Sequence, residues 1–303
     1  MAEIYSSAEE IIGNTPLVRL RGIERYFSLS ARIFAKLEKG NITGSVKDRP
    51  ALFMLNDFER RGLISKGGRI VLATSGNMGI SLSALAVRRG YKAVIVMPRA
   101  ASIERRKIIR ALGAELILTD GGMSEAVRMA EEIVENDVGV LSFRQFENPM
   151  NAYAHEATTG PEIYRDTEGA VDVFVAGVGT GGTIGGVARY LKSKLPSVKI
   201  VAVEPAESAV LSGGAPGSHR IQGIGAGFLP TILDKNLINE VFTVSSKQAE
   251  EGVRLLALRE GIPSGISSGA AVFAAVALAN NKENKGKNIV TLLPDGIEKY
   301  LTT

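Results

Sequence analysis

Short apolar runs rich in β-branched residues alternate with longer segments of helical period along most of this 303-residue chain. Such runs are typical of parallel strands buried on both faces, and the segments between them have the length of crossover helices. The sequence therefore predicts an α/β fold around mostly parallel sheets. The expected strands cover residues 32–35, 69–73, 92–97, 115–118, 173–176, 199–203 and 288–293, and the clearest helices cover 47–61, 78–89, 103–112 and 123–136.

Composition narrows the classes of function. With 45% apolar and 22% charged residues the chain is not disordered, and its net charge of +4 is scattered, so we expect no nucleic-acid partner. It has no cysteine and only His155 and His219, which excludes thiolate chemistry and indicates no metal site. The longest apolar stretch, 269–279, is too short for a membrane span, and residues 1–4 do not begin an export signal, so we expect a cytoplasmic protein.

The first of four distinctive motifs is GNITGSVKDRP at 40–50. Its glycines predict a turn with Ser45 as helix N-cap and Lys47 in the first helical turn. A cation opposes the helix dipole there, which favours a lowered pKa and an amine able to attack a carbonyl. The alternative is a solvated lysine beside Asp48 and Arg49.

The second motif is TSGNMG at 74–79, between a predicted strand and a helix. Hydroxyls, an amide and free backbone N–H groups at a helix start suit an anion such as a carboxylate. Simple capping by Ser75 and Asn77 would also explain the pattern.

The third motif is AGVGTGGT at 176–183, between a strand and a helix. Its glycines let the backbone approach a phosphate, and Thr180 and Thr183 add hydroxyl donors. The G-x-G-x-x-G spacing from Gly177, with Glu204 as the acidic residue, also fits a dinucleotide fingerprint, but no such unit stands at the N-terminus. No Gly-Lys-Ser/Thr follows, which excludes a nucleoside triphosphate loop. A single-phosphate site fits best.

The fourth motif is GISSGA at 265–270, again at a helix start. The hydroxyl of Ser267 could face a ring nitrogen, or it could be an ordinary helix cap. The glycine- and proline-rich segment 206–234 carries few helical signals, and loops of this length are usually functional.

In this order the four motifs resemble the pyridoxal-phosphate enzymes of the tryptophan-synthase-β fold group, and within it the cysteine synthases, or O-acetylserine sulfhydrylases. The resemblance covers almost the whole chain. It includes 12–18 (IGNTPLV), 45–49, 145–149 (QFENP), 159–163 (TGPEI), 179–183, 223–228 (GIGAGF) and 294–295.

The resemblance implies two three-layer α/β/α domains with the cofactor in the cleft between them. Residues 1–38 would complete the larger domain, 39–148 would form a smaller, mobile substrate-binding domain, and 149–303 would form the larger phosphate-binding domain. It also implies a homodimer, and in some relatives the tail of a serine acetyltransferase enters the cleft.

The resemblance further assigns roles to single residues. Lys47 would hold pyridoxal 5′-phosphate as a Schiff base and act as the catalytic base, Asn77 would bind its 3′-oxygen, and Ser267 its ring nitrogen. The phosphate cup would consist of Gly179, Thr180, Gly181, Gly182 and Thr183. The substrate-binding residues would be Thr74, Ser75, Gly76, Asn77, Met78, Gln145 and Gly223.

Met78 and Arg99 are among the positions that depart from the family pattern. Met78 stands where most relatives carry a threonine that contacts the substrate carboxylate, so one hydroxyl contact is lost. Alternatively, Met78 packs under the loop and does not face the substrate. Arg99 could attract an anionic substituent on the substrate, or it could be a solvated surface residue. We assign neither histidine a catalytic role.

The implied reaction is β-replacement, in which O-acetyl-L-serine and sulfide give L-cysteine through an α-aminoacrylate intermediate, with Lys47 taking and returning the α-proton. O-phosphoserine as donor and cystathionine β-synthase-like condensation of serine are the alternatives. A serine/threonine dehydratase, a cysteine desulfhydrase and a non-catalytic binding homologue also stay open.

Overall fold

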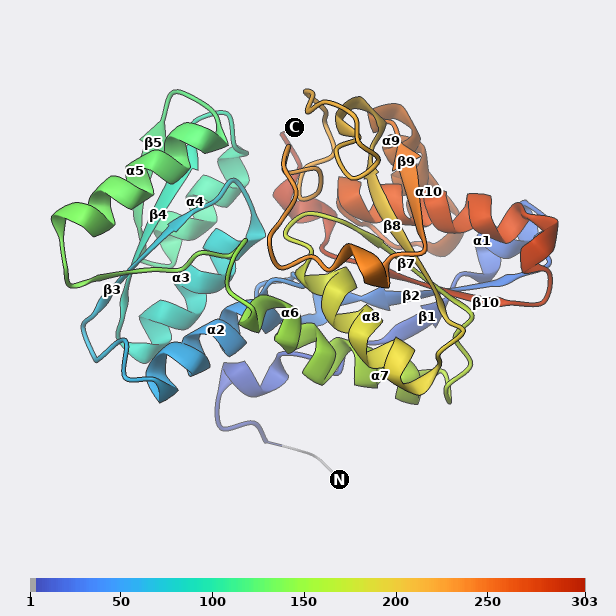
Figure 1. The fold of residues 1–303 in the computed structure, drawn as a ribbon, viewed down its shortest axis with the longest axis horizontal. Coiled ribbons are helices and arrows are strands. Elements are labelled where there is room, and N and C mark those ends of the chain that lie inside the picture. Colours follow the sequence, from blue (N-terminus) through green and yellow to red (C-terminus); the bar gives the residue numbers. More distant parts are fainter. Residues whose placement is uncertain (1–3, 303) are drawn as a thin grey trace.

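The computed structural model describes residues 4–302. Residues 1–3, on which the expectation about export largely rests, and residue 303 lie outside the described part. The chain forms a six-stranded sheet in the order β1-β2-β10-β7-β8-β9 and a four-stranded sheet in the order β5-β4-β3-β6, which lie side by side (Figure 1). We call these two parts the six-stranded unit and the four-stranded unit.

In the six-stranded unit only β1 and β2 pair antiparallel, and the other strand pairs are parallel. The four-stranded unit is parallel throughout. The strands are β1 (Leu17–Arg19), β2 (Arg32–Leu37), β3 (Arg69–Ala73), β4 (Lys92–Pro98), β5 (Glu115–Thr119), β6 (Val140–Ser142), β7 (Val173–Gly177), β8 (Lys199–Pro205), β9 (Glu240–Val244) and β10 (Asn288–Leu293).

Helices connect the strands and cover both sheets. They are α1 (Arg21–Tyr26), α2 (Asp48–Arg60), α3 (Asn77–Arg89), α4 (Ile103–Ala111), α5 (Met123–Asn136), α6 (Met150–Ala154), α7 (Gly160–Asp166), α8 (Gly182–Lys194), α9 (Ser246–Leu255) and α10 (Ile266–Asn280). One π-helical turn, His155–Thr159, joins α6 to α7, and another, Leu256–Glu260, extends α9. No helix of the described residues is both long enough and apolar enough to cross a bilayer.

Each sheet is buried on both faces, as its continuous apolar strands require. In β7, Val173 and Val175 pack into a cluster with α10, whereas Phe174 and Ala176 pack into a cluster with α8. In the four-stranded unit one face packs against α2 and α3 and the other against α5. The predicted α/β class, with two three-layer units and mostly parallel sheets, is confirmed.

Candidate active site

A pocket opens between the two units at the carboxyl ends of their strands. Lys47 and Asn77 line it from the four-stranded side, and the loop after β7 and the start of α10 line it from the other. Of the residues predicted for the site, the lining includes Lys47, Asn77, Gly179, Thr180, Gly181, Thr183, Gly223 and Ser267. Motifs distant in the sequence therefore meet at one cavity, as expected at the carboxyl edge of parallel sheets.

Lys47 is held by strand-like pairing with the segment after β10. Val46 N donates to Pro294 O at 2.8 Å, and Ser45 forms an isolated antiparallel bridge with Asp295. The prediction of Ser45 as N-cap is wrong, because this pairing fixes Ser45 before the helix, and α2 begins only at Asp48 with Lys47 in the cap position. The Ser45 hydroxyl instead accepts from Lys47 N at 3.2 Å.

The surroundings of Lys47 shift its amine toward the neutral form. Burial lowers the pKa of Lys47 from 10.5 to about 8, and the negative charge of Asp295 opposes that shift only in part. The expected direction of the shift is confirmed, but desolvation is its largest cause. The alternative of a solvated lysine is wrong, since Lys47 is a half-buried residue of the pocket wall.

The second motif forms the start of α3. Gly76 is the N-cap and no side chain caps the helix, so capping by Ser75 or Asn77 is wrong. Asn77 Nδ2 donates to Asp295 Oδ2 at 2.7 Å, across the boundary between the units. The first backbone N–H groups of this 13-residue helix lack helical partners, which leaves a place for an anion.

Other residues predicted to bind substrate stand around this helix start. Thr74 is buried and its hydroxyl accepts from Gly76 N at 3.2 Å, whereas Ser75 is exposed. Gln145 is buried and donates to Ala73 O at 3.1 Å. The Met78 side chain packs in the core between α2 and α3, so only its backbone is left to face a ligand at this helix start.

The third motif forms a tight loop at the start of α8. Gly181 has φ +82°, and a Cβ at Gly179 would overlap the Gly223 carbonyl oxygen, so both positions require glycine. Gly182 begins α8 and packs against Asn151 behind the loop, away from the pocket lining. Thr180 Oγ1 accepts from Asn151 Nδ2 at 3.0 Å.

His155 supports this loop from behind, which sequence reasoning missed. The fully buried ring lies with Nε2 at 3.3 Å from Thr183 Oγ1 and Nδ1 at 2.9 Å from Thr159 Oγ1. Burial, with the charges of Arg49 and Lys47, lowers the pKa of His155 well below 6.5, so the imidazole is neutral.

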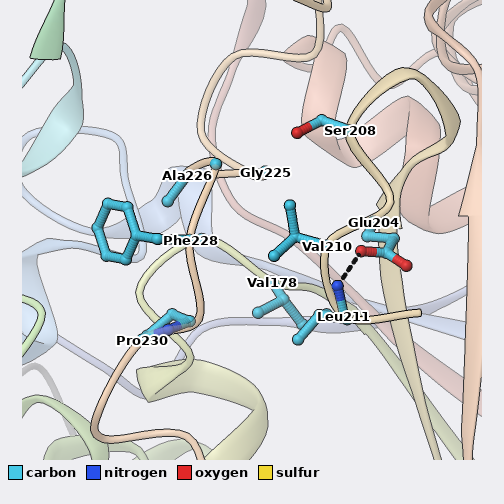
Figure 2. Close-up of a pocket in the computed structure, with 11 residues that line it drawn as sticks. Val178, Glu204, Ser208, Val210, Leu211, Gly225, Ala226, Phe228 and Pro230 are labelled. Carbon is cyan, nitrogen blue, oxygen red and sulfur yellow. Dashed lines mark hydrogen bonds between the residues drawn. The ribbon is translucent and has the colours of Figure 1, made fainter. Parts of the chain in front are cut away.

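Glu204 does not take the role that a dinucleotide site would require. It lies in a separate small pocket beside the loop that follows β8 (Figure 2). Its carboxylate accepts from Leu211 N at 2.7 Å and from Ser212 N at 3.0 Å, so it stabilises the segment 206–234. His219 has a similar structural contact, with Nε2 at 3.0 Å from Gly225 O.

Ser267 lies in the first turn of α10 with 3% of its surface exposed. The N-cap of α10 is Gly265 and no side chain caps the helix, so the capping alternative is wrong. The hydroxyl therefore remains available to the pocket that Ser267 lines.

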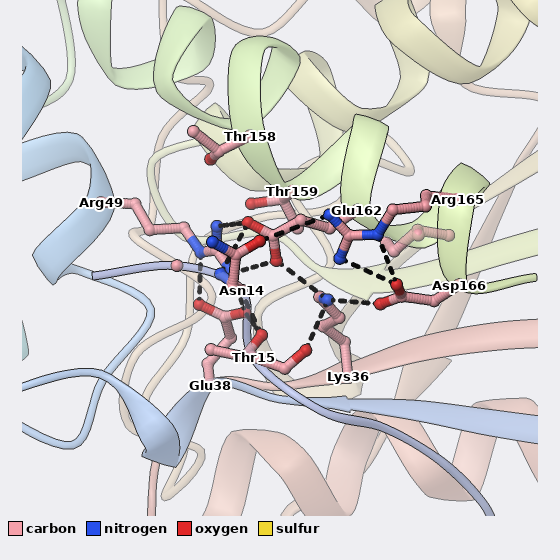
Figure 3. Close-up of polar contacts among 12 residues, drawn as sticks. Asn14, Thr15, Lys36, Glu38, Arg49, Thr158, Thr159, Glu162, Arg165 and Asp166 are labelled. Atoms are coloured by element: carbon pink, nitrogen blue, oxygen red, sulfur yellow. Dashed lines mark hydrogen bonds and ion pairs between the residues drawn. The ribbon is translucent and has the colours of Figure 1, made fainter. Parts of the chain in front are cut away.

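A buried ionic network anchors α2 immediately after Lys47 (Figure 3). Arg49 Nε donates to Glu38 Oε2 at 2.7 Å, and its Nη1 donates to Glu162 Oε1 at 2.6 Å. Lys36 Nζ lies 2.9 Å from Glu162 Oε2 and 3.0 Å from Asp166 Oδ2. The network joins β2, α2 and α7, so it fixes the base of the helix that carries Lys47.

Arg99 is a surface residue. It pairs with Asp120 at 2.6 Å, and more than half of each side chain is exposed. Arg99 is therefore a solvated surface residue, the second of the two interpretations of its sequence position.

Together these features fit a group with a carbonyl, a phosphate and a ring: an amine of lowered pKa, a glycine loop at a helix start, and a hydroxyl opposite. Residues 8–295 match the family of pyridoxal-phosphate dependent enzymes, and the chain belongs to that family. Its cofactor is pyridoxal phosphate.

Within that family the chain is similar to the cysteine synthases, as the motifs suggested. It is 48% identical to cysteine synthase A of Escherichia coli over 314 aligned positions, which cover 100% of this chain and 96% of that protein. It superposes on the crystal structure of a cysteine synthase from Entamoeba histolytica with a TM-score of 0.96 and 43% identity, covering 99% and 90% of the two chains. A hydrogen sulfide-producing enzyme from Fusobacterium nucleatum matches with a TM-score of 0.94 and 43% identity, over 98% and 100%.

Proposed function

We propose that this protein makes L-cysteine from O-acetyl-L-serine and sulfide with pyridoxal 5′-phosphate as its cofactor. The similarity to cysteine synthases over the full chain supports this reaction. The observation that carries the proposal is the lowered pKa of Lys47 in a pocket that also contains a glycine-rich helix start.

Four parts of the pocket would hold the cofactor. The Lys47 amine would hold it covalently, and the backbone of Gly179–Thr183 would bind the phosphate at the positive end of α8. The amide of Asn77 would lie at the ring oxygen, and the hydroxyl of Ser267 at the ring nitrogen. When bound, the cofactor supplies the electron sink for charge that develops at the substrate Cα.

The substrate carboxylate would bind at the start of α3, to backbone N–H groups and to the side chains of Thr74, Ser75 and Asn77. Gly76 and Met78 would contribute backbone, and Gln145 and Gly223 would flank the amino acid. The Lys47 amine takes the α-proton and later returns it, because it is the titratable group of the described pocket lining.

Larger-scale features belong to the same proposal. Residues 39–148 would form a mobile domain that closes on the rest of the chain, residues 1–38 and 149–303. The protein would act in the cytoplasm as a homodimer, and its cleft would admit the tail of a serine acetyltransferase.

A second candidate is release of hydrogen sulfide from cysteine. It is favoured by the Fusobacterium nucleatum relative, whose name describes a hydrogen sulfide-producing enzyme. The two reactions share the first proton transfer to Lys47 and differ in which group leaves the β-carbon.

Borohydride reduction of the holoenzyme followed by peptide mapping tests the role of Lys47. We expect the pyridoxyl group on the peptide that contains Lys47, and a label on another lysine would refute the assignment. A donor panel of O-acetylserine, O-phosphoserine and serine, each with sulfide or homocysteine, identifies the reaction. Formation of only keto acid and ammonia with every acceptor would refute cysteine synthesis.

A further inference from the structure

The carboxylate of Asp295 is buried where the two units meet. It has 1% of its surface exposed and lies two residues beyond the end of β10. Because Ser45 bridges Asp295 and Val46 N donates to Pro294 O at 2.8 Å, the backbone of Asp295 runs beside the loop that carries Lys47. The position of this carboxylate relative to Lys47 is therefore fixed by main-chain pairing.

The two oxygens of this carboxylate have different surroundings. Oδ2 accepts from Asn77 Nδ2 at 2.7 Å and from Tyr300 Oη at 2.6 Å. Oδ1 is buried and has no hydrogen-bond partner among the described residues. A Cβ at Gly265 would overlap Oδ1, so the glycine at the start of α10 keeps room for it. A buried carboxylate oxygen without a donor requires an explanation.

Three basic side chains interact electrostatically with Asp295, and two of them are engaged elsewhere. Lys299 donates to Gly44 O at 2.7 Å. Arg105, from α4, contacts Gln222 and lies 4.7 Å from the ring centre of Tyr300. The third basic group is the Lys47 amine, whose pKa the charge of Asp295 raises in part, but it forms no ion pair with Asp295 within the described chain.

We propose that Asp295 is a positioning residue for the reaction proposed above: Oδ2 orients the amide of Asn77, and the unpaired Oδ1 stabilises Lys47 as an ammonium. In that step the substrate Cα–H bond breaks, its electron pair stays with the substrate, and the proton forms a new N–H bond on Lys47. The charge of Asp295 balances the positive charge that appears.

The matched variants are Asp295→Asn, which removes the charge at constant shape, and Asp57→Asn as control. Asp57 is a buried carboxylate of α2 that pairs with Arg60 and Arg61 away from the pocket. After rapid mixing of each holoenzyme with O-acetylserine, the change in visible absorbance gives the maximal rate of the first half-reaction. We expect this rate to fall about 10- to 100-fold in Asp295→Asn, at an unchanged half-saturating concentration, and to stay at the wild-type value in Asp57→Asn.

The pH profile provides a second test in a variant that keeps the carboxylate. Burial raises the pKa of Asp295, and the hydrogen bonds from Tyr300 and Asn77 lower it in part. Removal of one donor by Tyr300→Phe therefore raises the pKa further. Since Asp295 must be ionised, the acid limb of the rate profile moves to higher pH in Tyr300→Phe.

Two results would overturn the role of Asp295: a wild-type maximal rate in Asp295→Asn, or an acid limb that Tyr300→Phe leaves in place. The Tyr300→Phe profile decides the question where Asp295→Asn does not fold. A wild-type protein that carries no cofactor on Lys47 or forms no L-cysteine would instead refute the proposed function itself.

Discussion

The lowered pKa of Lys47 costs the folded protein stability at neutral pH. Its pKa falls from 10.5 to about 8, so between these pH values the folded chain binds fewer protons than the unfolded chain. The free energy of unfolding therefore rises with pH across this window, and below pH 8 the cofactor-free protein carries a constant penalty of up to about 3 kcal/mol.

We predict that Lys47→Met raises the free energy of unfolding of the cofactor-free protein at pH 7 by up to about 3 kcal/mol. The advantage over the wild type shrinks as the pH rises from 8 to 10.5, which separates the effect of charge from the packing of the methionine. Urea unfolding at several pH values measures it, with the exposed residue Lys107 changed to methionine as control. A pH-independent difference would contradict the prediction.

At this scale the sequence predicted the residues that lie on the motifs and missed those whose partners are distant. Lys47, Asn77 and Ser267 stand at helix starts that nearby glycines indicate in the sequence. All three line the pocket. The error at Ser45 and the omission of His155 share a cause. The bridge to Asp295 and the contact with Thr183 come from other elements, and no local pattern encodes them.

Among the elements, α8 presents a matched pair of adjacent glycines. A Cβ at Gly186 would overlap the carbonyl oxygen of Ala152 in α6, whereas at Gly185 the nearest atom, Ile232 O, is 3.9 Å away. We predict that Gly186→Ala lowers the free energy of unfolding by about 1–3 kcal/mol and weakens cofactor retention, because α8 begins at the loop proposed to bind the phosphate. Gly185→Ala should instead add about 0.5–1 kcal/mol through helix propensity.

Urea unfolding and the visible absorbance that remains after dialysis measure the two effects in the same samples. Equal free energies of unfolding for the two alanine variants would contradict the prediction, because they would show that α6 and α8 can move apart without loss of stability.

The strands that the sequence missed are edge strands. All seven predicted strands formed, but β1, β6 and β9, each at the end of a sheet, were not predicted. A central strand is covered on both faces and reads as a continuous apolar run, whereas these edge strands are short or partly exposed. Helix bounds were nearly correct because glycines mark their ends, as at Gly90 after α3.

On the scale of the whole molecule, the N-terminal segment connects the two units. β1 and β2 belong to the six-stranded sheet. In contrast, Glu9 Oε2 pairs with Arg89 Nη2 of α3 at 2.6 Å, and Ile12 packs on the core of the four-stranded unit. That residues 1–38 complete the larger domain stays a prediction. Composition and spacing do not encode such a connection, because it depends on how the finished units meet.

Because the pocket lies between the two units, its position predicts how the cofactor affects stability. Lys47 and Asn77 come from one unit and Thr180, Gly223 and Ser267 from the other, so a cofactor bound in this pocket as proposed would contact both. We predict that its removal lowers the free energy of unfolding by about 2.7 kcal/mol when the free cofactor stands at 100 times its dissociation constant. The loss appears as faster amide exchange at the starts of both α3 and α8, measured by hydrogen–deuterium exchange of holo and cofactor-free protein. Faster exchange confined to one unit would mean that the cofactor belongs to that unit alone, because a ligand protects only the parts whose opening releases it.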